Sequence, residues 1–364
     1  MTKIIIVGSG IVGLSVAEFL SRKNSIPYQI EIISNEHPHS GSYAAAANLA
    51  TKGQLFARDN HFNLKLQAKK NYFNWLSSLI TEVNSNISIA RIYKNGCGVD
   101  YFTSQENRDK HYARVRQSDL DLKNRSLSLK SIVKEGNHKI IYEEESWVNA
   151  SSLLALLQEV LTHRGVKFFK STFGYHEYQN ILQSNKNIKL IICAGAWSKD
   201  LIANLNLSLP ESMKKKQRLT LGSTFYGENV LKNYNENFII HEIVSENLKE
   251  KVTFSGNNDN YYISSSTLKV ENVSDFDENL LSKKNKNLLE LSKINLADSP
   301  FLSADENLKI SKRDGFRVGY GHSEIVLEKL NAPGVHMSVY VCAGAHKSGY
   351  LFAPVLGAML QEML

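Results

Sequence analysis

The chain has 364 residues, of which 42% are hydrophobic, with a formal net charge of +7 and three widely spaced cysteines. This length and apolar content favour one large domain or two interlocked domains, and the cysteines fit neither a disulfide framework nor a metal site. No apolar stretch reaches the roughly 18 to 20 residues of a membrane span and no secretory signal pattern is present, so we expect a cytoplasmic protein without a membrane span.

The first predicted element is a buried strand that leads through a glycine turn into an amphipathic helix. Gly8 allows the tight turn, Gly10 lets the backbone approach a pyrophosphate, and Gly13 lets the helix pack closely on the strand. The helix N-terminus, at Ile11 and Val12, is then directed at the phosphates. Because the glycines have the required strand and helix on their two sides, the pattern predicts a site for FAD or NAD(P).

The apolar run at residues 29–33 is predicted to be the second strand of the nucleotide-binding unit. In such units an acidic residue at the end of this strand usually binds the ribose hydroxyls. Ser34 occupies that place here, and Glu36 lies two residues further on. Either Glu36 reaches back to the ribose, or the contact is lost.

A run of small residues follows at 39–49. Its low side-chain bulk lets the backbone come close to a flat cofactor, although the start of an Ala-rich helix has the same composition. Periodic apolar residues predict a helix over 61–83. Residues 91–102 are predicted to form strands around a turn at 96–98.

The middle of the chain returns to strands and helices of the nucleotide-binding type. A helix is predicted over 153–161 and a strand over 166–169. Residues 189–193 are predicted to form a continuous buried strand that runs into a second glycine turn at 194–198. The glutamates at 143–145 are typical of solvated charges in a turn.

Residues 219–268 change character, because alternating Thr, Tyr, Phe, Ile and Val with Asn- and Gly-rich turns predict an antiparallel sheet. Helical spacing returns over 277–294. The pattern of residues 338–364 predicts a strand at 338–342, a glycine turn at 344–349 and a helix at 351–364. The expected fold class is α/β, with a Rossmann-like domain built from separated pieces and an inserted antiparallel-sheet domain.

Four motifs occur in a fixed order: the glycine motif at 8–13, the small residues around Ser42, the turn at 194–197 and the segment 344–354. Together they resemble the D-amino-acid oxidase superfamily of flavoproteins, most closely the glycine oxidase and sarcosine oxidase type, over nearly the whole chain. The resemblance implies a FAD-binding domain of the glutathione-reductase type and an inserted substrate domain. The expected bounds are 1–90, 141–205 and 305–364 for the FAD-binding domain, and 91–140 and 206–304 for the substrate domain.

The resemblance implies FAD as the cofactor. No cysteine or histidine falls on the positions that relatives use for covalent attachment, so we expect noncovalent binding and no metal. The expected cofactor-binding residues are Gly8, Gly10, Ile11, Val12, Gly13, Ser34, Glu36, Ser42, Asn48, Leu49, Phe173, Ala194, Gly195, Trp197, Gly344, His346, Lys347, Ser348, Gly349 and Tyr350.

Three residues are expected to serve the chemistry. Arg317 follows a Gly-Phe pair that matches the family element in which an arginine holds the substrate carboxylate, and a guanidinium suits this task because it forms two parallel hydrogen bonds. A structural salt bridge is the alternative role. Lys347 lies where relatives often carry a basic residue that stabilises the reduced flavin. His346 either contacts the flavin or is structural.

The activity implied by the resemblance is oxidation of the C–N bond of an amino acid or secondary amine, by hydride transfer to flavin N5, with oxygen or another acceptor reoxidising the flavin. Segment 251–256 lacks the family's Tyr-hydrophobic-Pro-Arg pattern, which leaves the substrate open.

Three other functions remain open at this stage. One is a flavin enzyme that modifies carboxymethylaminomethyl-uridine in tRNA, since segment 344–354 also resembles its oxidoreductase half and the charge is basic. Another is a non-catalytic or accessory flavoprotein. The third is a 2-hydroxyacid dehydrogenase with His346 or His322 as its base.

Overall fold

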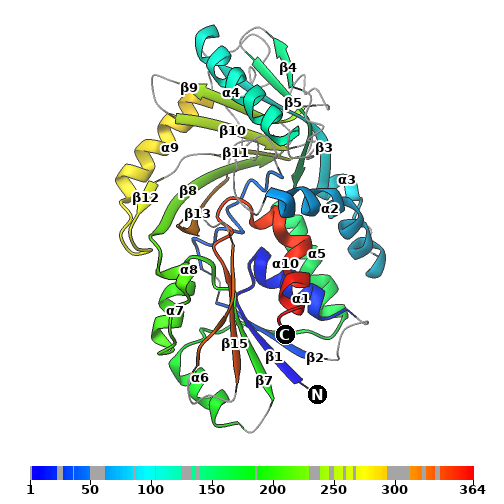
Figure 1. Ribbon diagram of the computed structural model, residues 1–364, viewed down its shortest axis with the longest axis vertical. Coiled ribbons are helices and arrows are strands. Elements are labelled where there is room, and N and C mark those ends of the chain that lie inside the picture. The colour runs from blue at the N-terminus through cyan, green and yellow to red at the C-terminus, as the bar shows by residue number, and fades with distance from the viewer. Residues whose placement is uncertain are drawn as a thin grey trace.

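The computed structural model describes residues 2–22, 28–35, 37–49, 62–84, 87–102, 104–123, 133–136, 139–184, 187–228, 238–245, 250–256, 260–264, 268–292, 311–321, 325–332 and 337–364. Its described strands form two sheets, one of six strands and one of nine. Figure 1 shows the six-stranded sheet at one end of the long axis and the nine-stranded sheet at the other.

The six-stranded sheet has the order β14-β15-β7-β1-β2-β6 and is parallel except for β14. Its strands are β1 (Thr2–Val7), β2 (Tyr28–Ile33), β6 (Lys167–Phe169), β7 (Ile188–Ile192), β14 (Val326–Leu330) and β15 (Ser338–Ala343). The central strands are almost continuous runs of Ile, Leu and Val because helices cover both faces of a parallel sheet. This confirms the α/β fold class with a Rossmann-like domain assembled from distant pieces.

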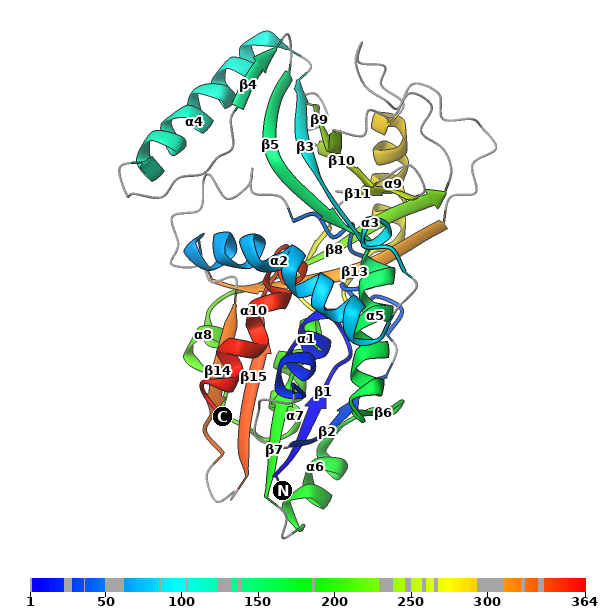
Figure 2. The same ribbon diagram turned by 90° about the vertical axis from the view of Figure 1, so that its right-hand side faces the viewer.

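Four helices pack together on one face of this sheet: α1 (Ile11–Leu20), α2 (Phe62–Glu82), α5 (Ala150–His163) and α10 (Gly349–Gln361). Figure 2 shows α1, α5 and α10 on the side of the strands that faces the viewer, with α2 crossing above them toward the second sheet. The opposite face packs against α6 (Tyr175–Leu182), η2 (Gly195–Trp197) and α7 (Ser198–Asn204). The helices predicted over 61–83, 153–161 and 351–364 and the strands predicted over 29–33, 166–169, 189–193 and 338–342 are confirmed.

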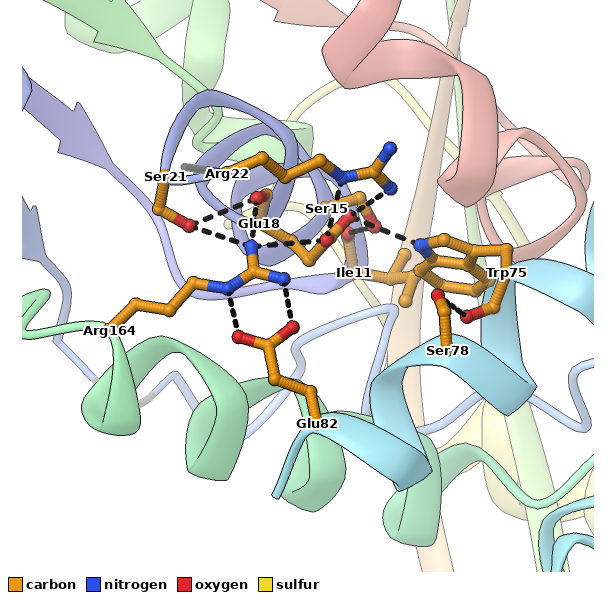
Figure 3. Close-up of polar contacts among 9 residues, drawn as sticks. All are labelled: Ile11, Ser15, Glu18, Ser21, Arg22, Trp75, Ser78, Glu82 and Arg164. Carbon is orange, nitrogen blue, oxygen red and sulfur yellow. Dashed lines mark hydrogen bonds and ion pairs between the residues drawn. The ribbon is translucent and has the colours of Figure 1, made fainter. Parts of the chain in front are cut away.

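A buried ion-pair cluster joins three of these helices at the C-terminal end of α1 (Figure 3). The Glu18 carboxylate, only 2% exposed, accepts hydrogen bonds from Arg22, which follows α1, at 3.0 Å and from the indole N–H of Trp75 in α2 at 3.1 Å. Arg164, which follows α5, lies 3.1 Å from the same carboxylate and pairs with Glu82 of α2 at 2.6 Å. The cluster fixes α1, and therefore fixes where its other end, the N-terminus, lies.

The nine-stranded sheet has the order β12-β8-β11-β10-β9-β3-β5-β4, with β13 on the other edge of β8, and only the β3–β9 pair is parallel. Its strands are β3 (Tyr93–Phe102), β4 (Val133–Gly136), β5 (Lys139–Val148), β8 (Gln217–Glu228), β9 (Phe238–Ser245), β10 (Glu250–Gly256), β11 (Asn260–Ser264), β12 (Leu268–Val270) and β13 (Ser311–Tyr320). The antiparallel region predicted over 219–268 is confirmed. The associated helices are α3 (Ile89–Ile92), α4 (Gln105–Lys123), α8 (Glu211–Lys214) and α9 (Glu278–Ser292), so the helix predicted over 277–294 is also present.

Two strands belong to a different sheet from the one that the expected bounds gave them. β5 pairs with β3, and β13 pairs with β8 along its whole length, so residues 141–148 and 311–320 lie in the nine-stranded sheet rather than with the FAD-binding part. Strand pairing of this kind depends on partners far away in sequence, which local alternation does not identify.

The prediction of two strands around a turn at residues 96–98 is wrong. Residues 93–102 form the single strand β3, which bends at a bulge where the register shifts between Gly96 and Gly98. The prediction of solvated turn charges at 143–145 is wrong as well, because these residues lie in β5 and Glu145 is fully buried against Gly98. Helix α4 is not anticipated by the sequence analysis.

No helix in the described part of the chain is long and apolar enough to cross a membrane. The same ranges contain no group of three or more His, Cys, Asp or Glu side chains that could hold a metal ion.

Candidate functional site

A cavity of about 1650 Å³ lies where the two sheets meet. Its walls come from the ends of β1, β2 and β7, from the loop 37–49, from β8 and β13, and from the turn before α10. Pockets for one small molecule usually have volumes of about 300 to 1,000 Å³. This cavity therefore has room for a large cofactor and a substrate together.

The glycine turn after β1 forms one end of the cavity. Gly8 has a φ of +115°, and a Cβ atom there would lie 2.4 Å from the Cys193 carbonyl oxygen. A Cβ on Gly13 would lie 2.0 Å from the Gly8 carbonyl oxygen. Both positions therefore require glycine, and the prediction that Gly8 turns the chain and Gly13 brings α1 close to it agrees with this packing.

The N-terminus of α1 opens into the cavity at Gly10, Ile11 and Val12. Gly10 provides no side-chain cap, the first turn holds no acidic residue, and the Ile11 N–H donates to the Ser42 hydroxyl at 3.0 Å. Such a helix end attracts anions through its free N–H groups and its dipole. Gly10 and Ser42 thus suit the pyrophosphate of a dinucleotide.

A second observation also fits a bound cofactor. The side-chain oxygen of Asn48 is buried, lines the cavity and accepts no hydrogen bond from the described residues. An acceptor buried without a donor costs roughly 1 to 3 kcal/mol, so a hydrogen-bond donor from a ligand would be favourable here. The residues present therefore fit FAD.

The small-residue loop 37–49 is not the start of a helix. Its carbonyl oxygens are held by donors from the second sheet and from α10. These donors are Phe316 N–H to His39 at 3.0 Å, Tyr350 hydroxyl to Ser42 at 2.7 Å, Arg313 to Tyr43 at 3.2 Å, Thr224 hydroxyl to Ala44 at 2.6 Å and Trp147 indole to Ala46 at 2.8 Å. The loop is thereby fixed as a backbone wall of the cavity, as its composition suggested.

At the end of β2, Ser34 lines the cavity and its hydroxyl accepts a hydrogen bond from the Ser9 hydroxyl at 2.8 Å. Glu36, the alternative ribose-binding residue, lies outside the described residues. Phe173, Ala194, Gly195 and Trp197 all line the cavity, and the Trp197 ring lies 4.1 Å from the ring of His37.

Two of the expected cofactor residues do not line the cavity. The Leu49 side chain is fully buried in the core beneath the helices, and its backbone N–H donates to the Ser146 carbonyl oxygen. Gly13 acts through helix packing. Both residues are neighbours of cavity residues in the sequence, but the Leu49 side chain lies in the core and Gly13 faces the Gly8 carbonyl oxygen.

The turn between β15 and α10 forms the other end of the cavity, with Gly344, Ser348, Gly349 and Tyr350 in its wall. The backbone N–H of His346 donates to the Val318 carbonyl of β13 at 3.1 Å, so the turn is attached to the second sheet. His346 itself has a φ of +44°, which is uncommon for a residue with a side chain.

The three expected chemical residues, Arg317, His346 and Lys347, meet in this wall. Burial lowers the pKa of Arg317, and its guanidinium makes no side-chain hydrogen bond or ion pair within the described ranges. Burial, followed by the charges of Arg317, Lys347 and Arg218, lowers the pKa of His346 to about 3. His346 is therefore neutral at ordinary pH, and its ring nitrogen Nε2 lies 3.4 Å from the Thr220 hydroxyl. Lys347 is exposed.

A polar wall on the second sheet, which the sequence does not predict, also faces the cavity. Asp100, Thr224, Thr253 and Ser264 line the cavity, and the pairing register places them in one row across β3, β9, β10, β11 and β8. At the β3 end, the hydroxyl of Tyr142 donates to the buried Asp100 carboxylate at 3.0 Å, and the His111 ring approaches both. Only the strand register reveals this row.

A protein-family model described as FAD dependent oxidoreductase matches residues 3–363. No curated protein matches the chain significantly.

Solved structures with similar folds include several amine- and amino-acid-metabolising proteins. Iminodiacetate oxidase from Chelativorans sp. BNC1 has a TM-score of 0.70 at 17% identity, covering 98% of this chain and 94% of that one. Glycine oxidase from Geobacillus kaustophilus has a TM-score of 0.69 at 16% identity, covering 100% and 95%. L-amino acid deaminase from Proteus myxofaciens, in complex with anthranilate, has a TM-score of 0.70 at 12% identity, covering 99% and 89%. At these identities the similarity concerns the fold alone.

Proposed function

Because the chain belongs to the family of FAD-dependent oxidoreductases, we propose that it oxidises the C–N bond of an amino acid or secondary amine. Arg317 holds the substrate carboxylate in this proposal. The observation that carries it is a half-buried guanidinium in the wall of the cavity, with no acidic partner among the described residues. A cation in such a place is costly unless an anion joins it.

FAD is held, in this account, by the glycine turn and α1 N-terminus at one end of the cavity and by the turn before α10 at the other. When bound, FAD supplies a hydride acceptor at flavin N5, and the imine product is hydrolysed by water.

The protein's own contribution is positioning and electrostatics. The two parallel hydrogen bonds from the Arg317 guanidinium fix the position of the carboxylate, and with it the positions of the neighbouring carbon and nitrogen of the substrate. The positive charges of Arg317 and Lys347 offset the substrate carboxylate, which would otherwise stabilise the protonated amine and raise its pKa. A neutral amine is the form that can lose hydride from its α-carbon.

The same electrostatics argue against a 2-hydroxyacid substrate that needs His346 as a base. With a pKa of about 3, the ring accepts a proton too weakly at neutral pH for efficient general-base catalysis. His322, the other histidine considered, lies outside the described residues.

The proposal is tested with FAD-loaded protein under anaerobic conditions, by following bleaching of the flavin absorbance on addition of glycine, sarcosine, proline, D- and L-amino acids, iminodiacetate and 2-hydroxyacids. We expect bleaching by at least one amine that carries a carboxylate. Arg317→Gln is expected to lower the bleaching rate constant at low substrate about 100-fold or more, since two charge-assisted hydrogen bonds are lost. Lys214→Gln, which removes an exposed charge on α8, serves as the matched control.

Bleaching by hydroxyacids alone would contradict the amine assignment. If no small molecule bleaches the flavin while tRNA binds with a steep salt dependence, the tRNA function is supported instead. Protein that stays colourless with added FAD would indicate an accessory role.

A further inference from the structure

A second arginine lies beside Arg317 on the same face of the nine-stranded sheet. In the antiparallel β8–β13 pair, Arg317 is opposite Thr220 and Gly319 is opposite Arg218. Side chains two residues apart on a strand share a face, so Arg218 and Arg317 are diagonal neighbours. Diagonal positions are about 7 to 8 Å apart, which long side chains can bridge.

Gly319 has no side chain, and the side chains of Arg218 and His346 pack closely over it. A Cβ atom on Gly319 would lie 3.3 Å from the Nη2 atom of Arg218 and 3.6 Å from both Cβ and Cδ2 of His346. The Arg218 guanidinium therefore reaches across β13 toward the turn that carries His346 and Lys347. Arg218 is exposed and does not line the cavity itself, so its guanidinium lies just outside this end of the cavity, next to His346.

Within the described ranges, every charge that acts on the His346 ring is positive, while Asp200 in the same cavity acts on Tyr320. The groups whose charge acts on the His346 ring are Arg317, Lys347 and Arg218, and His346 itself is neutral. Neither Arg218 nor Arg317 pairs with a carboxylate anywhere in the described ranges. Cations gathered this closely repel one another, and one carboxylate on Arg317 neutralises only part of the charge.

We propose that the substrate is an amine that carries two carboxylates, one bound by Arg317 inside the cavity and the second by Arg218 at its rim. This inference rests on the proposed function and adds the substrate class. The second carboxylate pairs with the exposed Arg218 guanidinium, and the positive charge of Lys347 adds to the attraction. Arg218 is thus a specificity residue, since it contacts the part of the substrate that does not react.

The test compares mono- and dicarboxylate ligands that cannot be oxidised as amines, using binding rather than turnover. Acetate, propionate, succinate and glutarate are titrated into FAD-loaded protein by isothermal titration calorimetry. Wild type is expected to bind at least one dicarboxylate ten times or more tighter than both monocarboxylates. Arg218→Gln is expected to weaken that dicarboxylate about tenfold and to change acetate and propionate less than twofold.

Three further variants make the result interpretable. Arg218→Lys keeps the positive charge but lacks the planar guanidinium, so its affinity for the dicarboxylate is expected to lie between those of wild type and Arg218→Gln. Lys214→Gln removes a nearby charge that already pairs with Glu211, and is expected to leave all four ligands within twofold of wild type. Arg317→Gln is expected to weaken mono- and dicarboxylates alike.

The outcomes separate the two proposals. If Arg317→Gln weakens all ligands but Arg218→Gln affects mono- and dicarboxylates equally, or neither, the second carboxylate site is refuted and the amine oxidase function stands. Equal affinity of wild type for both ligand classes refutes it as well. If Arg317→Gln leaves every carboxylate unaffected, the proposed function itself fails. A circular dichroism melt within 2 °C of wild type establishes that each variant is folded.

Discussion

Replacing Gly13 by alanine should break the contact that holds helix α1 on the glycine turn. The added Cβ would lie 2.0 Å from the Gly8 carbonyl oxygen and 3.1 Å from its carbon, whereas ordinary contacts begin at 3.4 Å. The helix would have to move away by more than 1 Å, and the obstacle is backbone, which cannot rotate aside. Overpacking of this kind costs about 1 to 3 kcal/mol, and we expect the upper end. At about 2 °C per kcal/mol, the Tm of the apoprotein should fall by about 6 °C.

Gly10→Ala separates cofactor binding from folding. There the added Cβ would lie 2.8 Å from the Ser42 hydroxyl oxygen, a side-chain atom that can rotate away. The fold should survive, with a Tm within 2 °C of wild type. The new methyl group, however, stands at the helix N-terminus where the backbone approaches the pyrophosphate, so we expect the dissociation constant for FAD to rise about tenfold or more.

Thermal unfolding of the apoproteins by circular dichroism, together with FAD titration by flavin fluorescence, distinguishes the two effects. Gly174→Ala is the control, because its nearest neighbour, a Glu177 side-chain oxygen, would be 3.5 Å away. The reasoning is refuted if Gly13→Ala melts with wild type, or if Gly10→Ala binds FAD as tightly as Gly174→Ala does.

Three further predictions concern stability, pH and the cofactor linkage. Glu18→Gln leaves Arg22 and Arg164 without their buried carboxylate and should lower the free energy of unfolding in urea by about 3 kcal/mol. The control Glu211→Gln, at the exposed pair with Lys214, should lower it by less than about 1 kcal/mol. Equal losses would contradict the role given to the cluster. Since the pKa of His346 falls from 6.5 to about 3 on folding, the wild type should lose stability as the pH drops through that range. His346→Asn, in which Asn tolerates the positive φ, should lose less stability over the same range, as measured by urea unfolding at each pH. If the free energy of unfolding of the two proteins changes with pH in parallel, this reasoning is wrong. Acid precipitation of the FAD-loaded protein should release all the flavin into the supernatant, and yellow pellets would show a covalent bond.

The glycine turn was predictable because its requirements are local. Gly8, Gly10 and Gly13 meet their constraints within one strand, one turn and one helix, and the spacing alone expresses them. The Rossmann-like sheet followed for the same reason, since long apolar runs identify buried parallel strands. The grouping of Arg317 with the turn at 346–347 came from the family resemblance and not from any local pattern.

The parts that escaped prediction depend on strand register. Whether β13 joins one sheet or the other is decided by its pairing with β8, which lies about 90 residues earlier in the chain. That pairing alone brings Arg218 next to Arg317. The row from Asp100 to Thr224 spans five strands in the same way, so none of its polar residues stands out when the sequence is read segment by segment.

The most direct test of this account is a crystal structure of the FAD-loaded protein soaked with acetate. It should place the isoalloxazine in the cavity between the two sheets, with the acetate oxygens within hydrogen-bonding distance of the Arg317 guanidinium. Acetate bound away from Arg317, or a flavin lying outside this cavity, would contradict it.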